Sequence, residues 1–135
     1  MNVSTKYKMF FSADLHFGHK NILTFCNRPF RDIKQMEQGL IASWNSVVRP
    51  FDIAINLGDL SLRGPKYMQW YQKLVPKMNG RKILILGNHD YLKPFQYIAC
   101  GFESVHTSLI INDNIVLAHD PAIATAIPKD MMMIC

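Results

Sequence analysis

The chain has 135 residues and a mass of 15.5 kDa, and 49% of its residues are hydrophobic while 19% are charged. This length suits one globular domain, and the hydrophobic share excludes disorder as the main state. The formal net charge of +5 favours anionic partners without identifying one.

Neither a membrane span nor a secretory signal is evident in the sequence. No apolar run approaches the roughly 20 residues that a membrane span requires, and residues 1–8 lack the apolar stretch of a signal peptide. The three cysteines lie far apart, so they indicate neither a disulfide framework nor a paired thiolate zinc site. We therefore expect a soluble cytoplasmic protein with no membrane partner.

Three apolar runs rich in β-branched and aromatic residues predict strands at residues 7–12, 53–57 and 82–86. Each run ends in a polar cluster and is followed by a stretch with helical character. Runs of this kind are typical of strands that are buried on both faces of a sheet. We therefore expect the α/β class, with a layered β-sheet core flanked by helices and polar clusters at the carboxyl ends of the strands.

The clearest helix is predicted over residues 33–48, where Asp32 can cap the first turn and apolar residues recur at helical spacing. A second helix is expected over residues 65–78, although Pro76 falls within its last turn. Shorter helical turns are expected at residues 21–25 and 94–100. From residue 105 onward the pattern changes to a β-hairpin, with strands at 105–111 and 115–119, and residues 131–135 predict one further strand.

Side chains that can bind metal ions follow each of the three apolar runs. Asp14 and His16 lie two residues apart, so in an extended segment both side chains point to one side. Asp59 follows the second run and can bridge two cations, because a carboxylate has two oxygens. Further candidate ligands are Asn88 and His89 after the third run and His119 at the end of the hairpin.

Each of these motifs also has a plainer interpretation when taken alone. Asp14 and His16 would suit an exposed turn, and His119 would suit a partly buried histidine at a strand end. His19, three residues after His16, could line the entrance of the site, although a surface histidine is the favoured interpretation. The recurrence of oxygen and nitrogen ligands at successive strand ends favours metal binding, because ligands of α/β sheets bind at the carboxyl edge.

Together these segments resemble the motifs of the calcineurin-like metallophosphoesterases. Residues 14–16 match the DxH motif of that family, residues 58–59 its GD motif, residues 87–90 its GNHD motif, and His119 the single histidine that follows. Residues 12–22, 28–30 and 44–52 are similar to a small bacterial and phage branch. The resemblance spans nearly the whole chain.

The resemblance implies a two-metal hydrolase of phosphoesters. In such an enzyme Asp14 and His16 hold the first ion, Asp59 bridges both ions, and Asn88 and His119 hold the second. Two divalent ions would supply an activated hydroxide, so no nucleophilic side chain is needed. Mixed oxygen and nitrogen ligands suit manganese, iron, zinc or nickel, so the identity of the metal stays open.

The resemblance also implies roles around the phosphate. His89 would contact the phosphate and protonate the leaving oxygen, and Asp90 would orient the imidazole ring. Independently of the resemblance, Arg63 and Arg28 lie in or beside the loops that leave the predicted strand ends, and we expect them to bind substrate. The substrate would be a phosphoester of a nucleotide or small metabolite. Diesters are favoured over monoesters, because a small open site places little restriction on the second group that a diester carries on its phosphorus.

One motif of the family is absent from the sequence. The family pattern ends in GHxH, whose histidines complete the two metal shells, and no such motif occurs here. We therefore expect a single phosphoesterase domain over residues 1–135 whose C-terminal part is truncated, with an exposed apolar strand that favours a homodimer. A naturally short form of weak activity and donation of ligands by another chain stay open.

Two other classes of function compete with hydrolysis. The missing motif is compatible with a catalytically impaired or inactive phosphoesterase fold that serves as an interaction module. The positive charge suggests nucleic-acid binding, but the sequence lacks the basic run and interleaved aromatic residues of such proteins. Nucleic acid is therefore not the expected partner.

Overall fold

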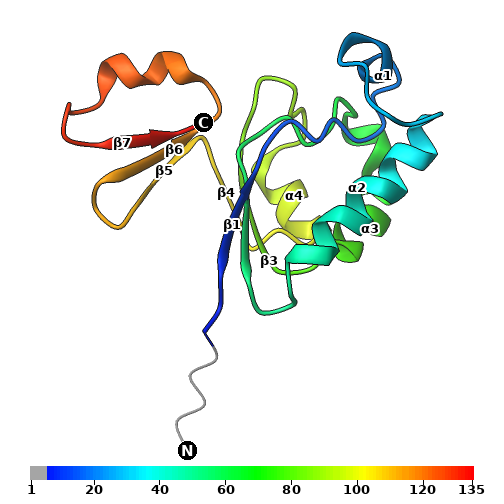
Figure 1. Cartoon of the computed structure of the whole chain (residues 1–135), viewed down its shortest axis with the longest axis horizontal. Helices are drawn as coiled ribbons and strands as arrows, with labels where there is room; N and C mark the ends of the chain where they lie inside the picture. The colour runs from blue at the N-terminus through cyan, green and yellow to red at the C-terminus, as the bar shows by residue number, and fades with distance from the viewer. Residues whose placement is uncertain (1–5) are drawn as a thin grey trace, which may run out of the picture.

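The computed structural model describes residues 6–135, which fold into two β-sheets and a layer of helices (Figure 1). The first sheet is parallel and contains, in spatial order, β1 (Met9–Ser12), β2 (Ile53–Asn56), β3 (Arg81–Ile85) and β4 (Ser104–His106). The second contains β5 (Ser108–Ile111), β6 (Ile115–Ala118) and β7 (Met132–Ile134), with β5 antiparallel and β7 parallel to β6.

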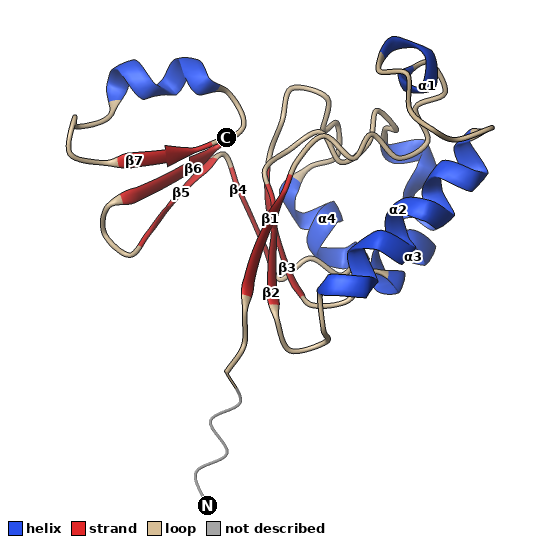
Figure 2. Cartoon of the chain, viewed as in Figure 1, coloured by secondary structure: helices blue, strands red, loops and turns tan. Residues whose placement is uncertain are grey.

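Helices pack against one face of the parallel sheet, and the second sheet lies on the side of the other face (Figure 2). The helices are α1 (Ile22–Phe25), α2 (Ile33–Val47), α3 (Met68–Leu74) and α4 (Pro94–Cys100), with 3₁₀ turns at Pro65–Tyr67, Val75–Lys77 and Pro121–Ala126. Trp44, Tyr71 and Tyr97 pack from α2, α3 and α4 into the core on the helical side. On the other side, Leu117 of β6 packs with Ile55 and Ile85 of the parallel sheet. This layering confirms the predicted α/β class.

The predicted 33–48 helix is confirmed to within one residue at its end. The Asp32 carboxylate accepts a hydrogen bond from the Gln35 N–H at 2.8 Å, which satisfies one of the free donors of the first turn. With 15 residues, α2 is the longest helix described. In residues 6–135 no helix has both the length and the apolar character that crossing a bilayer requires.

The predicted 65–78 helix is continuous only over Met68–Leu74. The segments on either side, Pro65–Tyr67 and Val75–Lys77, are 3₁₀ turns. Pro76 explains the second of them, because proline has no N–H to donate and its ring clashes with the carbonyl four residues earlier in an α-helix.

The expectation of a single strand over residues 105–111 is wrong. Thr107 divides it, so that β4 extends the parallel sheet beside β3, and β5 pairs with β6 in the second sheet. Full burial of the first strand is also wrong, because β1 forms an edge and leaves Met9 41% and Phe11 40% exposed. β4 forms the other edge of the first sheet, and the chain crosses from there to the second sheet.

Candidate metal centre

The loops that leave β1 and β2 are held together in an unusual backbone conformation. Asp14, His16 and Asp59 have φ angles of 54°, 53° and 55°, in the left-handed region that non-glycine residues rarely occupy. The Asp14 N–H donates to the Gly58 carbonyl at 2.9 Å, and the His16 N–H donates to the Asp59 carbonyl at 3.0 Å. Such strained residues persist where surrounding contacts fix them, and they cluster at functional sites.

Two glycines allow the loops to approach one another closely. A Cβ atom on Gly58, whose φ is 109°, would lie 2.5 Å from Nδ1 of His119 and 2.8 Å from the Gly87 nitrogen. A Cβ atom on Gly87 would lie 2.2 Å from Oδ1 of Asp59. Any larger residue at either position would therefore displace Asp59 or His119.

One group of candidate ligands lies at the ends of β1 and β2. Nε2 of His16 is 3.8 Å from Oδ1 of Asp14 and 3.6 Å from Oδ2 of Asp59. The Asp14 side chain is half exposed, whereas those of His16 and Asp59 are buried. Burial lowers the pKa of His16 below its usual value, although the negative charge of Asp59 opposes the shift. A neutral imidazole is the form that binds a metal ion.

A second group forms where β6 meets the parallel sheet. Nε2 of His119 is 3.0 Å from Oδ1 of Asn88 and 3.5 Å from Oδ1 of Asp59. Nδ1 of His119 is 2.9 Å from the Leu57 carbonyl, which can only accept a hydrogen bond, so Nδ1 carries the proton. In the neutral ring the Nε2 lone pair therefore faces two oxygens with no proton between them, an arrangement that a cation would satisfy.

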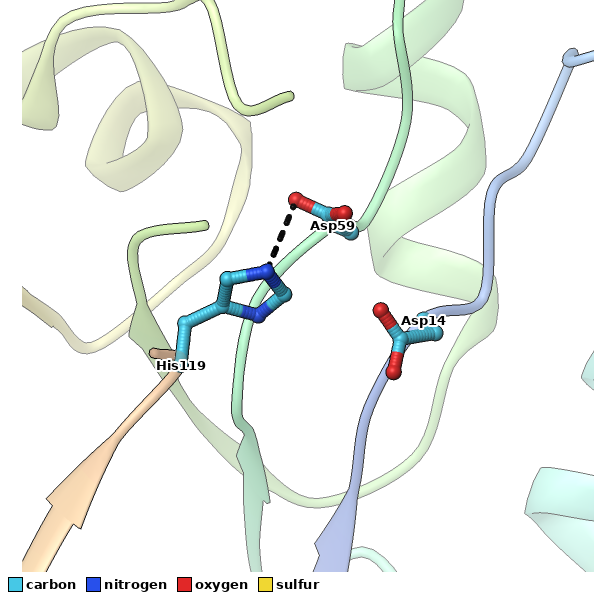
Figure 3. Close-up of side chains that lie close together, drawn as sticks. All are labelled: Asp14, Asp59 and His119. Carbon is cyan, nitrogen blue, oxygen red and sulfur yellow. Dashed lines mark ion pairs between the residues drawn. The ribbon is translucent and has the colours of Figure 1, made fainter. Parts of the chain in front are cut away.

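Asp59 lies between the two groups and contributes one oxygen to each. Its Oδ2 atom faces His16, and its Oδ1 atom faces His119 and accepts the His89 N–H at 3.0 Å. Figure 3 shows Asp14, Asp59 and His119 directed toward a common space, and their ligand atoms lie within 4.8 Å of one another. The divergence of the two Asp59 oxygens is what a bridging carboxylate requires, and the donor set fits divalent cations.

The structure gives Asp90 a different contact from the one that we expected. Its Oδ2 atom accepts the N–H groups of Gly87 at 2.7 Å and Asp59 at 2.8 Å, and its Oδ1 atom accepts that of Leu60 at 2.9 Å. Burial raises the pKa of Asp90, while these three hydrogen bonds act in the opposite direction. Asp90 therefore ties the loop after β2 to the loop after β3 and does not orient the His89 ring.

Tyr91 occupies the place beside His89 that we had expected for Asp90. The Tyr91 hydroxyl lies 3.2 Å from Nδ1 of His89, and the His89 and His16 ring centroids are 5.9 Å apart. His89 thus lies close to the first group of ligands. Sequence reasoning missed Tyr91, since its contact depends on how the loop after β3 turns back on itself.

The two arginines expected to bind substrate are both held by contacts within the protein. Arg28 donates to the backbone carbonyls of Asp14 at 2.6 Å and Leu15 at 2.7 Å, so it fixes the loop after β1. The Arg63 guanidinium lies over the ring of Trp70, 4.3 Å from its centroid, and over the ring of Tyr67 at 4.7 Å. A direct role of either arginine toward substrate stays a prediction.

His19 is buried more deeply in the site than its interpretation as a surface histidine suggested. Its Nδ1 atom is 3.2 Å from Nδ1 of His16, and its side chain is partly buried. Burial lowers the pKa of His19, and the nearby His89 and Arg28 lower it further. The sequence offers one signal for this contact, the spacing of three residues from His16.

Comparison with known proteins identifies a family and several relatives. The family model described as calcineurin-like phosphoesterase matches residues 7–129. An uncharacterized protein of Methanocaldococcus jannaschii is 43% identical over 83 residues, which are 62% of this chain and 47% of the relative. The gene 66 protein of Mycobacterium phage L5 is 38% identical over 80 residues, which are 59% of this chain and 38% of the relative.

A solved structure shares the fold. The crystal structure of a protein of unknown function from Aquifex aeolicus matches with a TM-score of 0.63 and 27% identity. The match covers 87% of this chain and 62% of the Aquifex chain. The chain therefore spans about half or less of the length of the curated relatives that it matches, and less than two thirds of the length of this solved structure.

Proposed function

The chain belongs to the calcineurin-like phosphoesterase family, and from this premise we propose that it acts as a metal-dependent hydrolase of phosphoesters. The observation that carries the proposal is the position of Asp59. Its two oxygens are directed to two different imidazoles, at 3.6 Å from His16 and 3.5 Å from His119. A single carboxylate shared in this way suits two cations better than one.

We assign the ligands to two ions. Asp14, His16 and Asp59 would hold the first ion, and Asp59, Asn88 and His119 would hold the second. Manganese, iron, zinc and nickel all suit this mixture of carboxylate, amide and imidazole donors, and manganese is the first metal to test. When bound, the two metal ions would supply a hydroxide at neutral pH and neutralise charge on the phosphoryl group.

The other residues of the site would bind the substrate and move a proton. His89 would protonate the leaving oxygen, with the Tyr91 hydroxyl at its Nδ1 atom limiting rotation of the ring. Arg63 would attract the phosphate. Its guanidinium is already ordered by stacking on Trp70 and Tyr67, so binding would cost less side-chain conformational entropy. Arg28 would act mainly through the loop that carries Asp14.

A phosphodiester is the proposed substrate class, with nucleotides and small metabolite esters as candidates. A cavity of about 520 Å³ adjoins the second group of ligands and is lined in part by Asn88, His119, Thr107 and Asp120. This space offers room for the second substituent that distinguishes a diester from a monoester.

A test of the proposal compares two nitrophenyl substrates. With Mn²⁺ we expect release of nitrophenol from bis(p-nitrophenyl) phosphate to be faster than from p-nitrophenyl phosphate. Prior removal of the metal with a chelator should abolish both reactions, and added Mn²⁺ should restore them. A diester rate no higher than that of the metal-free blank would contradict the proposal, and a purified chain that binds no metal would favour the interaction module instead.

A further inference from the structure

Two histidines of the first metal group face each other through equivalent ring nitrogens. The Nδ1 atoms of His16 and His19 are 3.2 Å apart, and the ring centroids are 5.3 Å apart. This distance fits an N–H···N hydrogen bond. A neutral imidazole has one N–H and one lone pair, so one of these two Nδ1 atoms donates and the other accepts.

The other nitrogen of His16 determines which ring must donate. Nε2 of His16 faces the carboxylates of Asp14 and Asp59 at 3.8 Å and 3.6 Å. To bind a metal ion, Nε2 must present its lone pair, which leaves the proton on Nδ1. Among the described residues, the hydrogen-bond partner of that Nδ1 atom is His19.

The backbone around Gly18 holds the two rings in this position. The His19 N–H donates to the His16 carbonyl at 3.1 Å, and Gly18 between them has a φ of 72°. Phe17 is fully buried, and its N–H donates to the Leu60 carbonyl at 2.9 Å. The turn is therefore anchored to the loop after β2, which also carries Asp59.

From these contacts we propose that His19 is a positioning residue for His16. Its Nδ1 atom accepts the Nδ1 proton of His16 and so directs the Nε2 lone pair of His16 to the metal ion. His19 itself then carries its proton on Nε2. This inference rests on the proposed function, because the ligand role of His16 is part of it.

The same contact permits a second arrangement of protons. If His19 Nδ1 donates, His16 must carry its proton on Nε2, where it faces the two carboxylates. His16 cannot bind a metal ion in that arrangement. Binding of the ion therefore selects one tautomer of both rings together.

Substitutions at His19 test this role through metal affinity. We expect His19→Ala to weaken Zn²⁺ binding by about 10-fold to 100-fold, because outer partners of ligating histidines contribute to affinity on this scale. In His19→Asn the amide oxygen can take the place of the Nδ1 atom, so the affinity should remain near that of the wild type. His106→Ala, at a partly buried histidine of β4 outside the site, is the matched control and should bind as the wild type does.

Titration of each variant with Zn²⁺ against a chromophoric chelator gives the affinities. Wild-type affinity in His19→Ala would overturn the proposal, and so would an equal loss in His19→Asn and His19→Ala. If the unaltered chain fails to bind Zn²⁺, the proposed metal site is rejected and this inference with it. Tight binding by both the unaltered chain and His19→Ala rejects the role of His19 alone.

A measurement on the unaltered protein does not depend on how the variants fold. Long-range ¹H–¹⁵N correlation spectra of the Zn²⁺-loaded chain distinguish protonated from unprotonated ring nitrogens of each histidine. We expect the proton on Nδ1 of His16 and on Nε2 of His19. A proton on Nδ1 of His19 in the loaded protein would overturn the proposal.

Discussion

Replacing Asp59 with asparagine is expected to lower phosphodiester turnover by about 10³-fold or more while the fold is retained. Asparagine has one side-chain oxygen where aspartate has two, so only one of the two imidazoles would still face an oxygen ligand. The neutral amide also removes the negative charge that holds two cations close together. The Asp59 N–H would still donate to Asp90, so the loop itself should keep its shape.

Turnover of bis(p-nitrophenyl) phosphate and metal content should be measured together for this variant. We expect the bound metal to fall along with the rate, because a bridging ligand belongs to both ions. Asp113→Asn is a matched control, since Asp113 is exposed in the loop between β5 and β6. Its φ of 63° is readily adopted by asparagine. A wild-type rate for Asp59→Asn would remove the basis of the two-metal assignment.

Replacing His89 with alanine is expected to slow the reaction in a way that depends on the leaving group. For an alkyl diester, whose alkoxide needs a proton to depart, we expect a loss of about 10²-fold to 10⁴-fold in kcat. For a nitrophenyl diester the loss should be much smaller, because nitrophenolate departs without protonation. The comparison therefore separates proton transfer from substrate binding.

His106→Ala serves again as the control and should leave both rates unchanged. Metal content should also be unchanged in His89→Ala, because the His89 side chain is not among the proposed ligands. An equal loss on both diesters would contradict the role of His89 as the proton donor and assign it to phosphate binding.

Much of the fold follows from local patterns in the sequence. The three apolar runs locate β1, β2 and β3 to within a few residues, and Asp32 together with the helical spacing locates α2. The limits arise where a neighbour in space decides the outcome. Nothing in residues 105–111 indicates that Thr107 separates two strands of different sheets, since threonine favours strands and no glycine or proline interrupts the segment.

The meeting of the candidate ligands could also be anticipated in part. Residues after β1, β2 and β3 must lie near one another, because the carboxyl ends of adjacent parallel strands share one edge of the sheet. His119 is different, since it follows β6 of the second sheet and its approach to Asp59 depends on how the two sheets pack.

Contacts around the ligands were the hardest to predict. Asp90 could either orient His89 or bind backbone N–H groups, and only the path of the loop decides between these. The contact between His16 and His19 likewise depends on the turn at Gly18. Spacing along the chain limits such contacts but does not define them.

Anomalous diffraction from Zn²⁺-loaded crystals, recorded on both sides of the zinc absorption edge, tests whether Asp59 bridges two metal ions. We expect two peaks about 3.5–4 Å apart on either side of the Asp59 carboxylate. One peak should lie about 2.0–2.2 Å from ligand atoms of Asp14 and His16, and the other at similar distances from Asn88 and His119. A single peak, or peaks away from Asp59, would contradict this expectation.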